Sequence, residues 1–213
     1  MSLAGPAVLC TVAVIGLLVA EQRGSQRGLW LTKPVASAAF IWAGLVAGAL
    51  DSTYGQLVMF GLLLCLAGDV LLIPRERPSV FRAGVLAFLL GHVAYCAAFL
   101  TRPLGTAGLV AGGVLLAAVV VAVLRWLGRS LPADMVWPVR AYMIVIGVMS
   151  TLACGVTAAG GPLAVAMGAL AFTASDVSVA RDRFVTHEFV NRAWGLPLYY
   201  AAQMLIAITP AMA

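Results

Sequence analysis

Eight apolar stretches of about 18–24 residues follow one another along this chain of 213 residues, and each can cross a bilayer core about 30 Å thick. Their apolar character is continuous, without the alternation of a barrel strand, so α-helices are the spanning element that they predict. We expect an all-α, polytopic membrane bundle of about eight transmembrane helices, forming a single integral membrane domain over 1–213. The predicted helices cover residues 3–20, 33–50, 55–73, 80–101, 104–127, 137–157, 161–180 and 194–212.

Composition excludes a soluble domain, because 63% of the residues are hydrophobic and 10% are charged, against about half and about a quarter in soluble domains. The first stretch is not expected to be a signal peptide, since no basic residue precedes it and no separate mature domain follows. The four cysteines lie inside predicted helices and form no CxxC pair, so we interpret them as small packing residues.

The basic residues are distributed by loop. Of the 13 Lys and Arg residues, all except Arg102 fall around the loops after the first, third, fifth and seventh predicted helices. The positive-inside rule places these loops in the cytoplasm and both termini outside. The net charge of +5 is therefore interpreted as topology and attraction to membrane lipids, with no nucleic-acid partner. The excess of Arg over Lys favours a bacterial source, and hence the inner (plasma) membrane.

Two aspartates interrupt otherwise apolar helices. Asp69 lies in GDV near the end of the third predicted helix, and Asp176 lies in SDV near the end of the seventh. These helices run in the same direction, so both carboxyl groups are expected at the same depth toward the cytoplasmic side. An Asp at the centre of a membrane helix costs about 2.5–3.5 kcal/mol, which makes a functional role the first interpretation. Anchoring of a loop by Arg75 or Arg181 is the structural alternative.

A possible internal repeat follows from the spacing. A basic loop follows each aspartate, and a ring residue comes 23 positions later, His92 after Asp69 and Tyr199 after Asp176. This spacing suits two parallel four-helix halves. Because the local match covers only a few residues, unrelated helices that share a depth are the other interpretation.

Further polar residues lie within the predicted helices. His92 shares a helical face with Phe88, Tyr95 and Phe99, at intervals of four, seven and eleven residues. That face can look into the bundle, where His92 is either a site residue or one side of an interhelical hydrogen bond. Other candidates are Tyr199 and Gln203, which are four apart, and Arg140 and Tyr142, near the start of the sixth helix. Packing or anchoring at the headgroup level explains these as well as substrate contact does.

No metal or cofactor is expected. The chain has two histidines, and His187 lies in a loop, whereas catalytic zinc needs about three ligands and an open position. One histidine with two aspartates is the weaker alternative. GxSxG, P-loop and GxGxxG motifs are absent from the sequence. The remaining chemistry is that of two carboxyl groups, a histidine and tyrosines, which favours acid–base catalysis.

Several segments together resemble the YhhN family. They are GDVLL with FRAGVLAFLLGHVAYCAAF, then VRAYMIVIGVMS, FTASDVSVARDRF and LYYAAQMLI, with KP at 33–34, in order over residues 33–206. Animal members are lysoplasmalogenases, so the resemblance implies a membrane enzyme that hydrolyses the vinyl ether bond of a lysoplasmalogen, a lysophospholipid. The products would be a fatty aldehyde and glycerophosphoethanolamine or glycerophosphocholine. The two aspartates proposed as catalytic in the family correspond to Asp69 and Asp176.

Vinyl ether hydrolysis begins with proton transfer to the alkene carbon, and water then traps the oxocarbenium ion. It needs one protonated carboxyl group, a form that burial favours, and one carboxylate that stabilises the cation and activates water. We expect Asp69, with the more apolar neighbours, to be the acid and Asp176, flanked by Ser175 and Ser178, to be the base. The reversed assignment is the alternative.

The predicted substrate-binding residues surround these carboxyl groups. Lys33, Arg140 and Arg192 are expected to hold the lipid phosphate, and His92 and Tyr199 to orient water or a carboxyl group. The full set is His92, Tyr95, Tyr199, Gln203, Lys33, Arg140, Tyr142, Asn191 and Arg192. In a source that lacks plasmalogens, another lyso-ether lipid or a different amphiphile would be the substrate.

A proton-coupled small-molecule or lipid transporter is the alternative function, because transporters also carry paired intramembrane carboxylates and parallel repeats. Against it, no predicted helix has a Gly-Pro break near its midpoint, and both aspartates lie away from the midplane. A structural or receptor-like module would leave both carboxyl groups unexplained. The sequence leaves the oligomeric state open.

Overall fold

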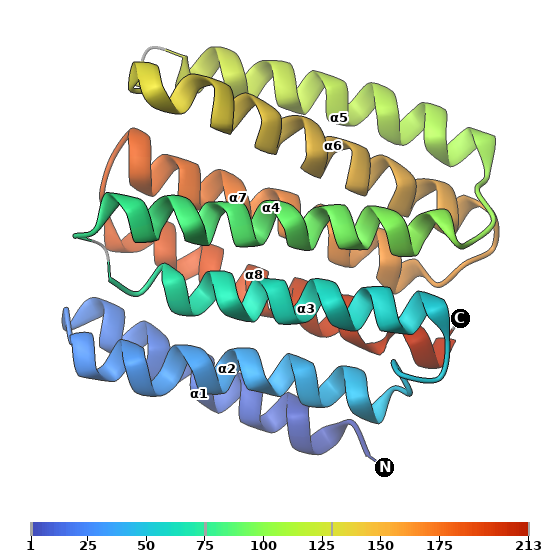
Figure 1. The fold of residues 1–213 in the computed structure, drawn as a ribbon, viewed down its shortest axis with the longest axis horizontal. Helices are drawn as coiled ribbons and strands as arrows, with labels where there is room; N and C mark the ends of the chain where they lie inside the picture. Colours follow the sequence, from blue (N-terminus) through green and yellow to red (C-terminus); the bar gives the residue numbers. More distant parts are fainter. Residues whose placement is uncertain (1, 75, 129, 213) are drawn as a thin grey trace.

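The computed structural model describes residues 2–74, 76–128 and 130–212. They form eight α-helices, two short 3-10 helices and no strand, which confirms the predicted all-α class (Figure 1). The helices are α1 (Ala4–Gln22), α2 (Gln26–Val46), α3 (Thr53–Leu71), α4 (Pro78–Leu100), α5 (Thr106–Leu127), η1 (Ala133–Met135), α6 (Val136–Ala158), α7 (Leu163–Phe184), α8 (Phe189–Ile208) and η2 (Thr209–Met212).

The second helix differs most from its predicted range of 33–50. α2 begins at Gln26, because the Ser25 side chain accepts a hydrogen bond of 3.1 Å from a backbone N–H of the first turn. It ends at Val46, and Gly48 then adopts a φ of 72°, which favours glycine. The start of the eighth helix was also predicted too late, since α8 begins at Phe189 rather than 194.

Seven helices, α1 to α7, are long and apolar enough to cross a membrane, the sixth counted together with η1. Large apolar side chains such as Val8, Leu31 and Val114 are exposed on the outside of the bundle. The chain is therefore a multi-pass membrane protein. α8 is less apolar because it carries polar residues inward, and it packs against α1, α2, α3 and α7.

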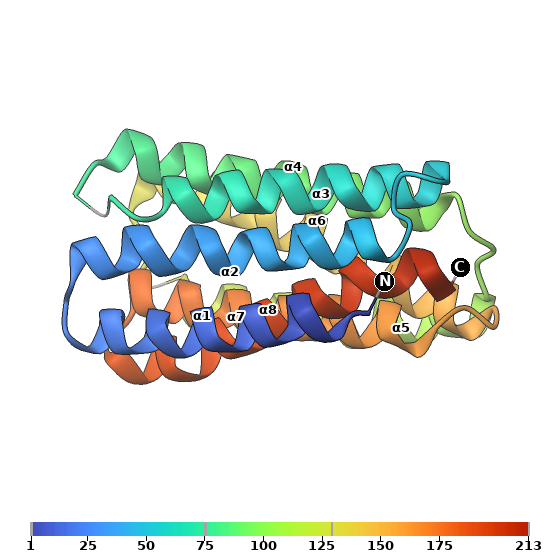
Figure 2. The same cartoon turned by 90° about the horizontal axis from the view of Figure 1, so that it is seen from below.

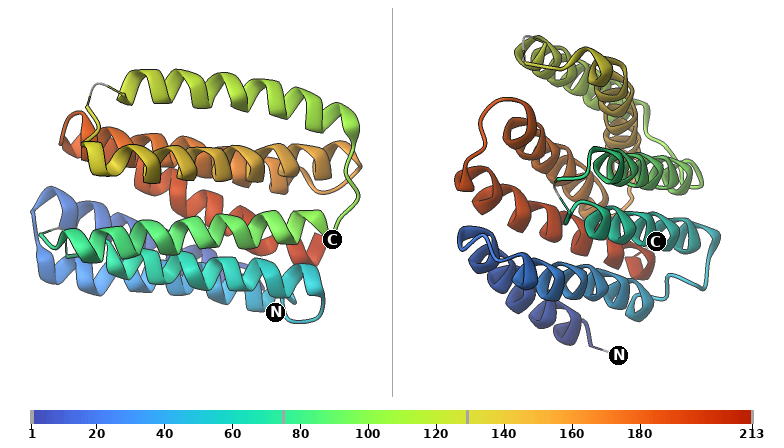
Figure 3. Two further views of the ribbon diagram at one scale, coloured as in Figure 1. Left: turned by 45° about the horizontal axis from the view of Figure 1, so that its top comes forward. Right: turned by 60° about the vertical axis from the view of Figure 1, so that its left-hand side comes forward.

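Consecutive helices pack as antiparallel hairpins. The loops after α1, α3, α5 and α7 gather at one end of the bundle, and both termini lie at the other (Figures 1 and 2). We name the end with these loops the basic end, because almost all the Lys and Arg residues surround its loops. α5 lies at the edge of the molecule, where it packs on α6 and touches α7 only slightly (Figure 3).

The two sets of four helices contact each other in a matching way. α4 packs on α6, and α8 packs on α2, which is the same contact with the halves exchanged. α1 also packs on α8, whereas α5 and α4 have no contact of comparable extent among the described residues. The arrangement is thus that of two parallel four-helix halves, with a closer fit on the α1 side.

Candidate active site

A cavity of about 220 Å³ extends from buried Asp69 to exposed side chains at the basic end. Helices α1, α2, α3, α4, α6, α7 and α8 contribute to its wall. The predicted site residues that line it are Lys33, Asp69, Tyr142, Asp176, Asn191, Arg192 and Tyr199. The structure therefore brings both aspartates, from helices four apart in the chain, to one cavity.

Asp69 lies among hydrogen-bond donors. Its Oδ2 accepts hydrogen bonds from Ser37 Oγ and from the Tyr199 hydroxyl, each at 2.7 Å, and the Lys33 ammonium lies 3.3 Å from Oδ1. The Asp69 side chain is 3% exposed. An ammonium and two hydroxyl donors around a buried carboxyl group stabilise its ionised form.

A chain of buried side chains continues behind Asp69. Gln203 Nε2 donates to the Tyr199 hydroxyl at 3.2 Å, and the Tyr95 hydroxyl donates to Gln203 Oε1 at 2.8 Å. Because Tyr199 accepts from Gln203, its own proton is directed to Asp69. Tyr95 and Gln203 thus act one layer behind the cavity wall, where the structure places them with Tyr199 and Asp69.

Asp176 has different partners. The Tyr142 hydroxyl donates to its Oδ2 at 3.0 Å, and His92 Nε2 lies 3.6 Å from the same oxygen. Among the described residues, no Lys or Arg nitrogen lies within ion-pair distance of Asp176. Arg181, the alternative loop anchor, instead bonds Asn191 and Glu188. Arg75 lies outside the described residues.

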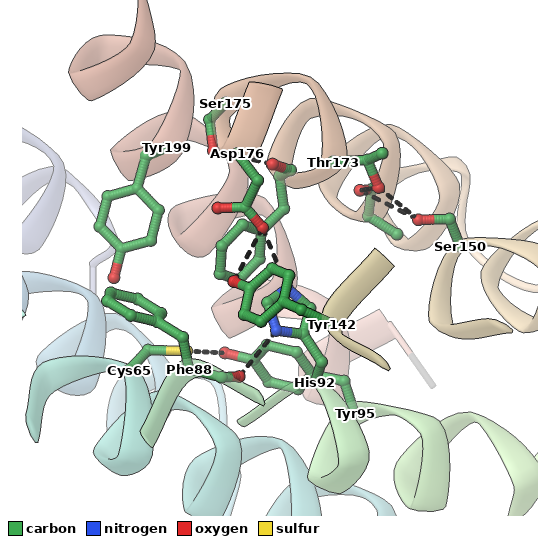
Figure 4. Close-up of polar contacts among 12 residues, drawn as sticks. Cys65, Phe88, His92, Tyr95, Tyr142, Ser150, Thr173, Ser175, Asp176 and Tyr199 are labelled. Atoms are coloured by element: carbon green, nitrogen blue, oxygen red, sulfur yellow. Dashed lines mark hydrogen bonds and ion pairs between the residues drawn. The ribbon is translucent and has the colours of Figure 1, made fainter. Parts of the chain in front are cut away.

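His92 is held in one orientation beside Asp176 (Figure 4). Its Nδ1 lies 2.7 Å from the Phe88 carbonyl oxygen, so Nδ1 carries a proton and donates it. The other nitrogen, Nε2, is buried without a hydrogen-bond partner and faces the Asp176 carboxyl group. The ring packs on Phe172 at 4.4 Å and on Tyr142 at 5.2 Å between centroids. In the neutral imidazole, Nε2 is an acceptor, so it can share a proton with Asp176.

The Phe172 ring connects the two carboxyl sites. It packs on His92 and, at 5.3 Å between centroids, on Tyr199. Small residues make room for this aromatic wall: a Cβ at Gly68 would lie 2.7 Å from the Phe88 ring, and one at Gly61 would clash with Tyr95. Phe172 thus lies between His92, which is beside Asp176, and Tyr199, which is beside Asp69.

A sequence profile of the YhhN family matches residues 28–209. The chain belongs to the YhhN family. Bovine lysoplasmalogenase TMEM86A is 33% identical over 158 residues, which cover 71% of this chain and 64% of that relative. Human lysoplasmalogenase TMEM86B is 32% identical over 174 residues, which cover 81% of this chain and 69% of that relative. The chain thus spans somewhat less than two thirds of TMEM86A. No solved structure matches it significantly.

The mouth of the cavity in this YhhN-family protein is a network of charged residues. Arg192 lies between Glu21 of α1, at 3.2 Å, and Asp182 of α7, at 2.9 Å. Asn191 also donates to Asp182, at 3.4 Å. Arg183 lies at the rim with its guanidinium 4.1 Å from the centroid of the Phe81 ring.

Arg140, predicted to hold phosphate, does not belong to the cavity. Its guanidinium lies 5.3 Å from the centroid of the Trp137 ring, on the exposed side of α6. Arg140 and Tyr142 are two residues apart, so a helix directs them to different sides. The prediction grouped them by depth and could not separate their faces.

Four residues of the site were not predicted from the sequence: Ser37, Phe172, Glu21 and Asp182. Ser37 follows Lys33 by four residues, and Phe172 precedes Asp176 by four, so a search for neighbours on the same helical face would have found both. Glu21 and Asp182 meet Arg192 only through tertiary packing. The described residues contain no group of three or more His, Cys, Asp and Glu side chains that could hold a metal ion.

Proposed function

We propose that this YhhN-family protein is a lysoplasmalogenase-like hydrolase that cleaves the vinyl ether bond of a single-chain ether phospholipid. The observation that carries the proposal is that Asp69 and Asp176 line the same cavity with unlike partners. Two carboxyl groups in different surroundings are what acid–base cleavage of an acid-labile bond requires. The names of the relatives agree with this chemistry.

The reaction adds one water across the vinyl ether. A carboxylic acid transfers its proton to the alkene carbon remote from oxygen, which leaves an oxocarbenium ion. A carboxylate stabilises this cation and removes a proton from the attacking water, giving a hemiacetal. The hemiacetal then breaks into a fatty aldehyde and a glycerophospho alcohol, either glycerophosphoethanolamine or glycerophosphocholine.

The cavity suggests how such a lipid would bind. Its inner wall contains apolar side chains, including Val85, Val139 and Leu196, which suit the alkenyl chain. At the mouth, Arg183 and Arg192 suit a phosphate group. In this proposal the basic end faces the cytoplasm and both termini lie outside, in a bacterial inner membrane.

The test is an aldehyde-release assay on purified protein in detergent, with lysoplasmenylethanolamine as substrate. Wild type should release aldehyde, whereas Asp69→Asn and Asp176→Asn should release almost none. Asp51→Asn is the matched control, because Asp51 is exposed and does not line the cavity. No aldehyde from folded wild type would refute the hydrolase, and substrate binding without product would favour a transporter. Substantial activity in both cavity variants would refute the site.

A further inference from the structure

We infer that Asp176, positioned by His92, donates the proton, and that Asp69 is the carboxylate that activates water. This inference rests on the proposed function and adds to it a direction for each proton. It reverses the assignment expected from the residues that flank each aspartate along its own helix.

The first step of the argument is the state of Asp69. Lys33 Nζ lies beside its Oδ1, and Tyr199 and Ser37 donate to its Oδ2. A proton on Oδ1 would face an ammonium, and a proton on Oδ2 would compete with two donors. Each neighbour thus favours the anion, which is the form that a base must have.

The second step is the state of Asp176. Its Oδ2 accepts one hydrogen bond, from the Tyr142 hydroxyl, and faces His92 Nε2, while the Phe88 carbonyl already takes the proton of Nδ1. Nε2 is therefore a buried lone pair aimed at a carboxyl group, and the missing partner is a proton between the two. With no Lys or Arg at ion-pair distance among the described residues, that proton is not displaced by a fixed cation.

The third step is that the two sites occupy corresponding positions. Tyr199 follows Asp176 by as many residues as His92 follows Asp69, yet Tyr199 bonds Asp69 and His92 approaches Asp176. Each carboxyl group is thus served by a ring from the other half. Lys33 and Arg140 are as far apart in the sequence as Asp69 and Asp176, and only Lys33 reaches a carboxyl group. The difference between the two carboxyl sites therefore comes from the different side chains at equivalent positions of the two halves.

The proton transfers balance over one turnover. Asp176 gives its proton to the alkene carbon and becomes a carboxylate, and Asp69 takes a proton as water adds to the cation. When the hemiacetal breaks, Asp176 removes the hydroxyl proton and Asp69 protonates the departing glycerol oxygen. Both groups return to their starting states, with one water consumed. His92 does not touch the reacting atoms in this scheme and is a positioning residue.

Infrared difference spectra test the inference without using activity. Purified full-length wild type, Asp176→Asn and Asp69→Asn are compared near neutral pH through the C=O stretching band of a protonated carboxyl group. The band should disappear in Asp176→Asn, persist in Asp69→Asn and shift in frequency in His92→Gln. The opposite pattern, or no such band in wild type, overturns the inference. This measurement decides which carboxyl group is protonated even if the substrate proposal fails.

The pH dependence of aldehyde release gives a second, reciprocal test. An acid must be protonated, so its ionisation sets the loss of activity at high pH, whereas the base sets the loss at low pH. His92 acts on the acid, Asp176, and is faced by Asp176 from α7 and by Tyr142 from α6. Lys33 acts on the base, Asp69, which Tyr199 also faces from α8.

His92→Gln should move the high-pH limit and lower kcat by about 10- to 100-fold, while Lys33→Met should move the low-pH limit. Exchange of these two effects would overturn the inference while leaving the hydrolase in place. If wild type released no aldehyde at any pH, the proposed hydrolase function itself would be refuted. Helical circular dichroism equal to that of wild type at the assay temperature shows that each variant is folded under the assay conditions.

Discussion

The surroundings of Asp69 and of Asp176 differ although the backbone around them is alike. Each aspartate lies in the C-terminal half of the third helix of its set of four, and side chains reach it from the preceding helix and from the last helix of the other set. Around Asp69 these are an ammonium and two hydroxyl donors. Around Asp176 they are one hydroxyl donor and an imidazole lone pair.

The comparison shows that the arrangement of the helices and the chemical surroundings of each carboxyl group are determined separately. The parallel helices α3 and α7 bring both carboxyl groups to one cavity, and a few side chains at equivalent positions give each group different partners. Lys33 and Arg140 show this most directly, since one reaches a carboxyl group and the other stacks on Trp137 at the surface. Four predictions test the comparison, beginning with the largest effect.

Asp69→Asn and Asp176→Asn should each lower kcat by about 10³-fold or more, since each removes an essential proton transfer. The double variant should be only slightly worse than the worse single one, because groups that act as a unit are not additive. Rates of aldehyde release measure this. A double variant whose loss equals the product of the two single losses would mean that the carboxyl groups act independently.

Lys33→Met should lower the free energy of unfolding by about 3–5 kcal/mol, because it leaves the buried Asp69 carboxylate without its cation. Arg140→Met, at the equivalent position, removes only a surface cation–π contact and should cost about 0.5–1 kcal/mol. Unfolding in mixed micelles with increasing denaturing detergent compares the two. Equal costs would show that Asp69 does not depend on Lys33.

Tyr199→Phe should lower kcat by about 10- to 100-fold, the range expected for loss of one hydrogen bond to a charged acceptor. Tyr54→Phe is its control, because the Tyr54 hydroxyl bonds Thr209 at 2.8 Å and lies outside the cavity lining. The control should keep wild-type turnover in the same assay. Unchanged turnover in Tyr199→Phe would remove this hydroxyl from the Asp69 site.

Gln203→Leu should have the smallest effect, about a two- to tenfold loss of kcat, because it acts on Asp69 only through Tyr199. Ser150→Ala is the control near the second carboxyl site, because Ser150 bonds Thr173, whereas Asp176 is bonded by Tyr142. Its turnover should match wild type. If Gln203→Leu lost as much activity as Tyr199→Phe, Gln203 would contribute more to catalysis than the orientation of the Tyr199 hydroxyl.

The sequence by itself determined the all-α class, the multi-pass character and the common direction of the two helices that carry Asp69 and Asp176. These follow from run length and helix direction, which need no knowledge of packing. It failed at the starts of α2 and α8, where polar residues such as Gln26 and Arg192 lie inside helices. Their side chains find partners in the folded protein, Gln26 at the Ile73 carbonyl and Arg192 at Asp182, so a polar residue there does not end the helix.

Only the tertiary structure decided which side chain serves which carboxyl group. The helices carry apolar residues on every side, because lipid and neighbouring helices are equally apolar, so periodicity does not show which face is turned inward. The apolar residues that flank Asp69 along its own helix favoured it as the acid, but they carry no information about side chains from other helices. Lys33 and Tyr199 reach it from α2 and α8, and His92 reaches Asp176 from α4. The ionisation of a buried group depends on such charges and donors across the packing, which no local stretch of sequence contains.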